Sequence, residues 1–274
     1  MHAPYRGHRI VPAASAPLDA FTTPAAAYSM RRLRSAYTGP AIRLRRASDN
    51  AEADIPFLGF TSFTGAPIDT AAANAHCNAT TCFVRTWYDQ SGLARDVVMT
   101  TAGLQPLFVA NCQNGLPCAR TTTAGQKVET SAGITTATGK GTLNAVAHRV
   151  AGGQYCFPIA LAPASTGNAI FINNNPNEWA LTDYATFLVP AAAENAWHTA
   201  VGVINGASSV IRLDTAETAG TVAGKVTTGP ISIASQPDAG VTCSYVEGIY
   251  WDNYFLTAGE RAALTANQKS FWGF

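Results

Sequence analysis

Short apolar segments separated by turn residues run through most of this chain. Gly, Asn, Thr and Pro fill the intervals, and Ile42 and Leu44 alternate with Arg43 and Arg45 as in a half-buried strand. Segments of this length and spacing are typical of a two-layer antiparallel sandwich. We predict strands near residues 83–88, 105–110, 142–150, 168–172, 185–189, 197–204, 208–214, 230–234 and 243–255.

Composition supports one sizeable all-β domain. The chain has 274 residues with 23 Gly, 15 Pro and only 13% charged residues, which is long enough for a two-layer core. The net charge of +1 excludes a global field that would hold nucleic acid or an anionic membrane. No apolar segment has the length needed to span a bilayer, and the N-terminus lacks the hydrophobic segment of a signal peptide.

Two helices are expected outside the strands. The segment AAAYSMRRLRSAY from Ala25 reads as a short N-terminal helix that ends at Gly39 and Pro40. Thr257 and Glu260 form an S/T-x-x-E capping box, which predicts a C-terminal helix over the following RAALTANQK.

Residues 1–24 differ in composition from the rest of the chain. They are rich in Pro and Ala with scattered basic residues, which predicts an extended arm rather than part of a core. Arg6 and Arg9 are its candidate anchor residues, because they could meet carboxylates on a partner. Residues 25–274 contain no repeat and no second linker, so they are predicted to form a single domain.

The six cysteines indicate an oxidising environment. Cys77 and Cys82 have no histidine between them and no second CxxC motif to complete a zinc site, so they suit a disulfide-closed turn. Cys112 and Cys118 flank a turn that brings two strand ends together. Cys156 and Cys243 are left over, and a bond between them would close a long loop. The alternative is six reduced, buried cysteines that act as small hydrophobic residues.

Other polar residues have ordinary structural interpretations. Asp89 in WYDQSG could bind calcium or sugar, but an Asp in this context more often organises a turn. The acidic residues 49, 52 and 54 fit a solvated loop beside arginines better than a calcium site. No metal or other cofactor is predicted, because the three internal histidines are too scattered for a metal site: His76, His148 and His198. The sequence also shows no motif of a serine catalytic triad.

Three stretches carry a family resemblance. The segments SAYTGPAIRLRRASDNAEADI, CNATTC and WYDQSGLARD resemble the catalytic domain of fungal α-L-arabinofuranosidases of glycoside hydrolase family 54, over about residues 25–272. The first of these segments is more similar to sandwich proteins of tailed phages and prophages of alphaproteobacteria. The C-terminus EGIYWDNYFLTAGERAALTANQKSFWG is similar to that of laminin-G-like sandwiches. The resemblance implies a concanavalin/laminin-G-like β-sandwich, or jelly roll.

The resemblance also implies catalytic positions. Retaining glycosidases use two carboxylates, and the family's nucleophile is a glutamate on a mid-chain strand. The matching segment NEWALTDYATFLVP offers Glu178 and Asp183, with Tyr184 at the position of best correspondence. Asp238 in SQPDAG matches the family's acid/base aspartate. The family has two adjacent cysteines against the sugar where this chain has Tyr155 and Cys156, which leaves Cys156 able to pair with Cys243.

Aromatic and amide side chains suggest a sugar-contacting surface. Aromatic rings pack on the apolar faces of sugars, and amides bond to the hydroxyl groups. Trp87, Trp197 and Trp251 lie in predicted strands and are assigned to the core. The candidate ligand-binding residues are therefore Tyr155, Asn173, Asn174, Asn175 and Trp179.

Together, these features predict a phage virion surface protein, either a capsid decoration or a tail or fibre component. Its β-sandwich would be non-catalytic and held by the N-terminal arm. Its partners would be other virion proteins, host cell-surface glycans and further copies of itself. The alternatives are a secreted α-L-arabinofuranosidase-type retaining glycosidase and a purely structural decoration protein without a ligand.

Overall fold

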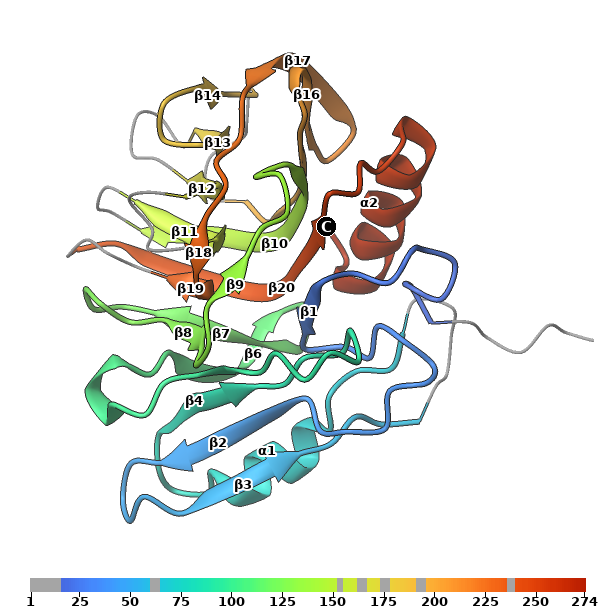
Figure 1. Cartoon of the computed structure of the whole chain (residues 1–274). Helices are drawn as coiled ribbons and strands as arrows, with labels where there is room; N and C mark the ends of the chain where they lie inside the picture. Colours follow the sequence, from blue (N-terminus) through green and yellow to red (C-terminus); the bar gives the residue numbers. More distant parts are fainter. Residues whose placement is uncertain are drawn as a thin grey trace, which may run out of the picture.

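The chain folds into two packed β-layers with one long helix on the outside (Figure 1). The structure is a computed structural model, and it describes residues 16–59, 65–151, 155–161, 167–172, 178–190, 196–235 and 240–274. All pairings between the described strands are antiparallel. The predicted antiparallel β-sandwich is therefore confirmed.

The first layer is built around the long strand β20. One edge of β20 pairs with β10, which continues through β15 and β16 to β17, and the other edge pairs with β1 and β7. The strand bounds are β17 Ala216–Val222, β16 Gly206–Leu213, β15 His198–Ile204, β10 Gly141–Ala151, β20 Thr242–Asp252, β1 Ala26–Ser29 and β7 Leu116–Thr121.

The second layer runs in the order β14-β13-β12-β11-β19-β8-β5-β4-β2-β3. The bounds are β14 Phe187–Leu188, β13 Trp179–Thr182, β12 Ala169–Ile172, β11 Cys156–Leu161, β19 Ile231–Ser235, β8 Val128–Thr130, β5 Val97–Val98, β4 Cys82–Trp87, β2 Ile42–Arg46 and β3 Glu52–Ile55.

Few elements lie outside these two strand series. Strand β6 pairs with both β4 and β7 and so connects the two layers. A two-stranded ribbon of β9 and β18 stands apart from them. The bounds are β6 Leu107–Gln113, β9 Ile134–Thr135, β18 Thr228–Gly229, α1 Thr70–His76, the 3₁₀ turn η1 Ala102–Leu104 and α2 Ala258–Trp272. Among the described residues, no helix is long and apolar enough to cross a membrane.

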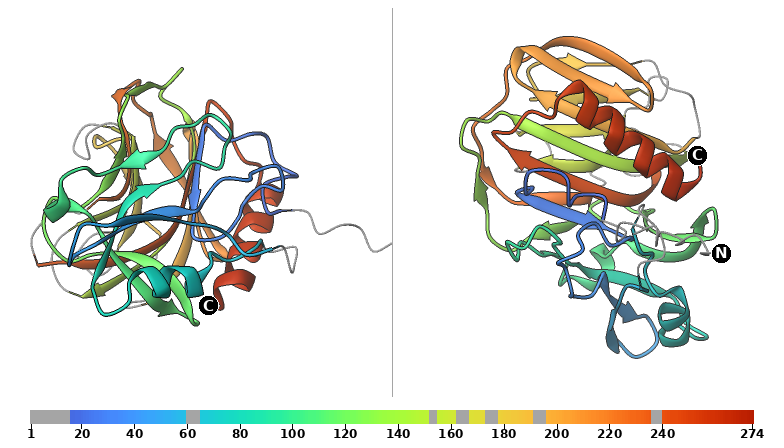
Figure 2. Two further views of the ribbon diagram at one scale, coloured as in Figure 1. Left: turned by 90° about the horizontal axis from the view of Figure 1, so that it is seen from below. Right: turned by 90° about the vertical axis from the view of Figure 1, so that its right-hand side faces the viewer.

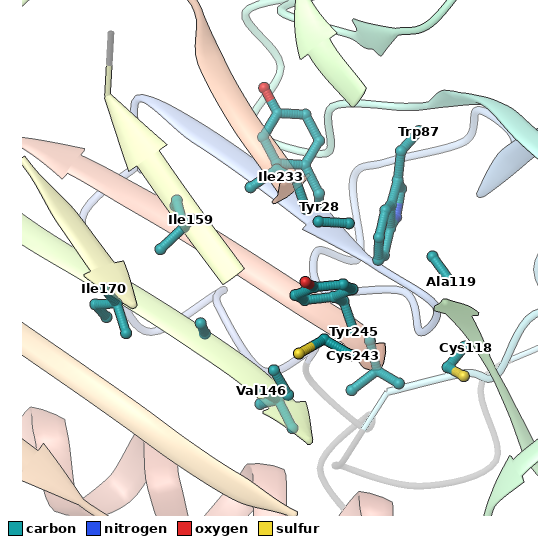
Figure 3. Packing of buried hydrophobic residues seen from close by; sticks show 14 of the residues in the cluster. Tyr28, Trp87, Cys118, Ala119, Val146, Ile159, Ile170, Ile233, Cys243 and Tyr245 are labelled. Atoms are coloured by element: carbon teal, nitrogen blue, oxygen red, sulfur yellow. The ribbon is translucent and has the colours of Figure 1, made fainter. Parts of the chain in front are cut away.

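The main core lies between the layers, where apolar side chains from both meet. Ile159 and Ile170 from the second layer and Val146 and Tyr245 from the first belong to one buried cluster (Figure 3). Trp87 is fully buried in the same cluster, as predicted. Burial of this kind is the principal stabilising contribution to a sandwich of this size.

Helix α2 covers the outer face of the first layer (Figure 2). Its predicted capping box is present, because the Thr257 hydroxyl accepts from the Glu260 N–H and the Glu260 carboxylate accepts from the Thr257 N–H. Trp272 near its end is fully buried. The predicted C-terminal helix is confirmed.

A buried polar network fixes α2 to the first layer. Arg31 donates two hydrogen bonds to Glu247, from Nε at 2.8 Å and from Nη2 at 3.2 Å, and both side chains have 0% exposure. Gln268 of α2 donates to Glu247 at 2.6 Å and to Asn144 at 2.7 Å. The buried Gln268 amide of α2 thus finds its partners on the sheet, as buried polar groups generally do.

The predicted N-terminal helix is wrong, because Ala26–Ser29 forms strand β1. All four residues are buried, and they pair in register with residues 247–250 of β20. A strand buried on both faces shows no apolar–polar alternation, so its period is hidden in the sequence. Pairing with the central strand overrides the helix preference of the alanines.

The described part of the predicted arm packs on the domain. Leu18 is fully buried and its N–H donates to the Leu33 carbonyl at 2.9 Å. The Trp251 indole donates to the Thr22 carbonyl at 2.9 Å. Residues 16–24 are therefore part of the folded body. Arg6 and Arg9 lie outside the described residues, and the anchoring role given to them stays a prediction.

All six cysteines are paired. Cys77–Cys82 links the end of α1 to the start of β4, and Cys112–Cys118 links β6 to β7. Cys156–Cys243 crosses the core from β11 in the second layer to β20 in the first.

Candidate functional site

Four strands of the second layer end on one line. Phe157 of β11 is paired with Ser235, the last residue of β19. Cys156 is paired with Ile172, the last residue of β12, which is itself paired with Trp179, the first residue of β13. The segments that continue from these four positions therefore leave the sheet at the same end of their strands. We call this end of the four strands the β11 edge.

Several predicted site residues belong in sequence to the β11 edge. Tyr155 immediately precedes β11, and Glu178 immediately precedes β13. Asn173, Asn174 and Asn175 follow β12 in the sequence, and Asp238 follows β19 by three positions. These four residues lie outside the described residues. The topology thus joins chain segments that are more than 80 residues apart in the sequence.

The outer face of the second layer is apolar near this edge. Cys156, Ile159 and Leu161 of β11 point into the core, whereas Phe157 and Ala160 belong to a separate outer cluster. Strand β12 contributes Ala169 and Phe171 to this cluster, and β13 contributes Ala180. Side chains alternate between the two faces of a strand, so the outer face has its own apolar surface.

Five aromatic rings gather on this face, and we call them the outer aromatic cluster. Phe157 stacks on Tyr184 with ring centroids 6.1 Å apart and planes 16° apart, and on Phe171 at 5.8 Å and 29°. Tyr155 and Phe187 each meet Phe171 edge-on, at 6.0 Å and 5.7 Å. These are the offset and T-shaped geometries that aromatic pairs prefer.

Asp183 shapes the turn that places Tyr184 in this cluster. Its Oδ1 accepts from the Ala185 and Thr186 N–H groups and from the Thr186 hydroxyl, and its Oδ2 accepts from the Gly224 N–H. Burial acts to raise the pKa of Asp183, but these hydrogen bonds outweigh it and leave the pKa lowered. With 2% exposure and both oxygens occupied, Asp183 has no open face for a substrate. The structure assigns it a structural role instead of the predicted catalytic one.

Of the two predicted carboxylates that the structure describes, Glu178 is the accessible one. It is half-buried and lies one residue before Trp179, whose side chain points into the core. The alternation along β13 therefore puts residue 178 on the outer side, with Ala180 and the outer aromatic cluster. Glu178 and Asp183 flank opposite ends of β13, so they cannot form a close pair with each other.

Trp179, predicted to contact ligand, is instead a buried core residue. It has 2% exposure and belongs to the main core, where its ring meets His198 edge-on at 5.8 Å. Tyr155 is half-buried at the β11 edge, a position that fits the predicted contact with sugar. Sequence reasoning missed Phe157, Phe171 and Phe187. For Phe157 and Phe171, the alternation with core residues in CFPIAL and AIFI was the available signal.

Asp89 organises a turn, as predicted. Its Oδ1 accepts from the Ala27 and Ser91 N–H groups, and its Oδ2 accepts from the Ser91 hydroxyl and the Arg95 N–H. The acidic residues pair with arginines as predicted: Arg43–Asp54, Arg46–Asp49 and Arg85–Glu52. The predicted loop is wrong for Glu52 and Asp54, because both lie in strand β3. Within the described ranges, no three His, Cys, Asp or Glu side chains gather as a metal site would require.

A hollow of about 310 Å³ lies near the other end of β19 and is lined, among the described residues, by residues 94–96 and 130–135. Asp96 is the only carboxylate in its lining. Burial raises the pKa of this carboxyl group, and the Asp89 charge adds to the effect. None of the predicted site residues lies in this lining.

The fold and the β11 edge together define a class. A β-sandwich with an aromatic face beside candidate carboxylates is suited to carbohydrate-active proteins. The family model "Alpha-L-arabinofuranosidase B, catalytic" matches residues 18–156, just over half of the 274 residues, and the chain belongs to this family.

Individual relatives agree with the family. The chain is 36% identical over 95 residues to an α-L-arabinofuranosidase B of Emericella nidulans and to an α-L-arabinofuranosidase of Hypocrea jecorina. Each alignment covers 33% of this chain and 18% of the relative. The match thus spans less than a fifth of the relatives' length, so their activity comes to this chain only as a proposal.

Solved structures extend the likeness over the whole fold. A GH54 α-L-arabinofuranosidase soaked with a cyclic sulfate inhibitor aligns with a TM-score of 0.68 at 18% identity, covering 88% of this chain and 61% of the other. An arabinofuranosidase complexed with arabinofuranosyl-α-1,2-xylobiose aligns with a TM-score of 0.70 at 18% identity and the same coverage. At this identity, the likeness establishes the fold alone.

These findings correct the expected function. The expectation of a phage virion protein, as capsid decoration, tail or fibre component, is wrong, because the family and the relatives are α-L-arabinofuranosidases. The closer resemblance to phage proteins found no support. The error came from weighing the lost cysteine at Tyr155 and the basic N-terminus above the family motifs.

Proposed function

We propose that this protein is a retaining glycoside hydrolase that releases α-L-arabinofuranosyl groups, with Glu178 as nucleophile and Asp238 as acid/base. The observation that carries the proposal is the β11 edge. In a chain of this family, the start of β13, next to Glu178, and the end of β19, three residues before Asp238, lie at the same edge beside an aromatic surface.

The distances along the chain are compatible with a catalytic pair. Strands β19 and β13 are three strand spacings apart in the sheet, about 14 Å. Asp238 lies three residues beyond Ser235, a length of chain that can reach up to about 10 Å. Two side chains directed toward each other can cover the remainder, to the separation of about 5–5.5 Å that retaining enzymes use.

The mechanism then follows from the two roles. Asp238 in its acid form gives its proton to the glycosidic oxygen while the Glu178 carboxylate attacks the anomeric carbon, so the bond to the leaving group breaks and a glycosyl ester forms. Asp238, now a carboxylate, takes a proton from water, and the resulting attack releases the sugar and frees Glu178. Tyr155 offers its ring to the sugar where the family has a cysteine.

The disulfides support an extracellular site of action. The three disulfides Cys77–Cys82, Cys112–Cys118 and Cys156–Cys243 are typical of proteins that work in an oxidising compartment. We therefore include secretion in the proposed function.

The test is hydrolysis of 4-nitrophenyl α-L-arabinofuranoside by wild type, Glu178→Gln and Asp238→Asn. We expect turnover by wild type and losses of at least about 100-fold in both variants. Azide, a nucleophile that needs no general base, should restore turnover to Asp238→Asn but not to Glu178→Gln. Asp183→Asn serves as the control for a neighbouring carboxylate and should retain turnover in its folded fraction. Absence of wild-type activity on this and related aryl glycosides would refute the proposal.

A further inference from the structure

The outer aromatic cluster ends in an exposed ring. Phe187 of β14 has 55% exposure, which makes it the most exposed aromatic side chain among the described residues. Its ring rests edge-on against Phe171 at 5.7 Å with the planes 78° apart. Exposing so large an apolar side chain in water is unfavourable, and such surfaces commonly mark binding sites.

Local structure holds the Phe187 ring in place. Phe187 is paired with Thr182 across β13 and β14, and the Thr182 hydroxyl donates to the Thr186 carbonyl at 2.7 Å. The four hydrogen bonds to Asp183 fix the intervening turn. A ring that is already ordered loses little conformational entropy when a ligand binds, which favours affinity.

The chemistry of the cluster indicates a neutral ligand. Its members are Phe, Tyr and Ala side chains without a charge. The Tyr155 hydroxyl makes no hydrogen bond within the described part of the chain, so it can bond to a ligand hydroxyl group. Flat apolar rings with hydroxyl groups at the margin complement the faces and rims of sugar rings.

The cluster is continuous with the β11 edge. Tyr155 lies at that edge, Phe171 contacts Tyr155, and Phe187 contacts Phe171 on the far side. The aromatic surface thus extends away from the candidate carboxylates instead of enclosing them. A single sugar at the edge would leave Phe187 without a contact, whereas a chain of sugars could reach it.

We propose that the surface from Tyr155 to Phe187 binds the main chain of a neutral polysaccharide whose arabinofuranosyl branch enters the β11 edge. This inference rests on the proposed function for the identity of the branch, but the binding itself does not require catalysis. Phe187 is a specificity-determining residue for polymeric substrates.

The test compares Phe187→Ala with Phe187→Trp and with Val226→Ala. Val226 has 65% exposure and lies outside the outer aromatic cluster, so its variant is the matched control. Binding of the full chain to soluble arabinoxylan and to debranched arabinan is measured by affinity electrophoresis. Kinetics are measured on arabinoxylan and on 4-nitrophenyl α-L-arabinofuranoside.

We expect Phe187→Ala to weaken polymer binding roughly 3- to 10-fold, the effect of losing one aromatic contact, while Phe187→Trp and Val226→Ala bind like wild type. The rise in KM for arabinoxylan should exceed that for the nitrophenyl substrate by a similar factor. Equal polymer binding by Phe187→Ala and wild type would overturn the inference, even if hydrolysis is intact. If wild type shows no turnover but Phe187→Ala still binds the polymer more weakly than wild type, the result would support the inference and refute only the proposed hydrolysis.

Discussion

The outer faces of the two layers are built on opposite principles. The first layer buries its outer face under α2, with the charged pair Arg31–Glu247 fully enclosed and fully bonded. In the second layer near β11–β14, the described residues on the outer face form a cluster of aromatic rings and alanines, and Phe187 at its margin is exposed to solvent. The comparison indicates that one face stabilises the domain and the other is available for ligands, although both belong to the same sandwich.

The largest effect should come from breaking the buried face. In Glu247→Gln, Arg31 keeps its charge but loses its counter-charge in a dry environment, and the new amide group faces donors from Arg31 and Gln268. We expect a loss of about 3–5 kcal/mol in the free energy of unfolding, measured by urea denaturation.

The matched control is the exposed pair Arg43–Asp54, whose hydrogen bonds are as short, at 2.7 and 2.8 Å. The Asp54 side chain has 40% exposure, so Asp54→Asn should cost less than about 1 kcal/mol. Similar losses in the two variants would contradict the structural role assigned to the first outer face.

A smaller effect is expected at the turn that holds the second face. Asp183→Asn replaces one acceptor oxygen by an NH₂ group that must face a backbone N–H, so we expect a loss of about 1–3 kcal/mol. The pKa of Asp183 in the folded state lies below its unfolded value of 3.8. The carboxylate therefore stabilises the folded state above pH 3.8, and this stabilisation is lost as the pH falls through the folded-state pKa.

The wild type should therefore lose stability more steeply than Asp183→Asn on acidification below about pH 4. Urea denaturation at pH 3 and pH 6 measures the difference. A variant whose stability falls with pH as steeply as that of wild type would show that the Asp183 carboxylate does not hold the turn.

The elements that could be predicted are those with local signals. The capping box of Thr257 and Glu260 located α2, and alternation located β2. Apolar segments bounded by turn residues located the long strands β10 and β20. Strand β1 was missed because its burial depends on pairing with residues more than 200 positions away. Short strands such as β8 carry too few residues to show a period.

The residues of the candidate site could be predicted from the sequence only in part. Motif resemblance pointed to Glu178, Asp183 and Asp238, but only the strand register separates Glu178 from Asp183 by placing them at opposite ends of β13. The role of Phe187 could not be inferred from the sequence, because exposure of an aromatic residue depends on which neighbours fail to cover it.

Covalent trapping can show whether Glu178 is the nucleophile at the β11 edge, as we propose. Wild type would be incubated with a cyclic sulfate of arabinofuranose configuration, digested, and examined by peptide mass spectrometry. We predict one inhibitor adduct per chain, on the Glu178 carboxylate, and none in Glu178→Gln. An adduct on Asp183, or no adduct in a wild type that hydrolyses the nitrophenyl substrate, would contradict the assignment.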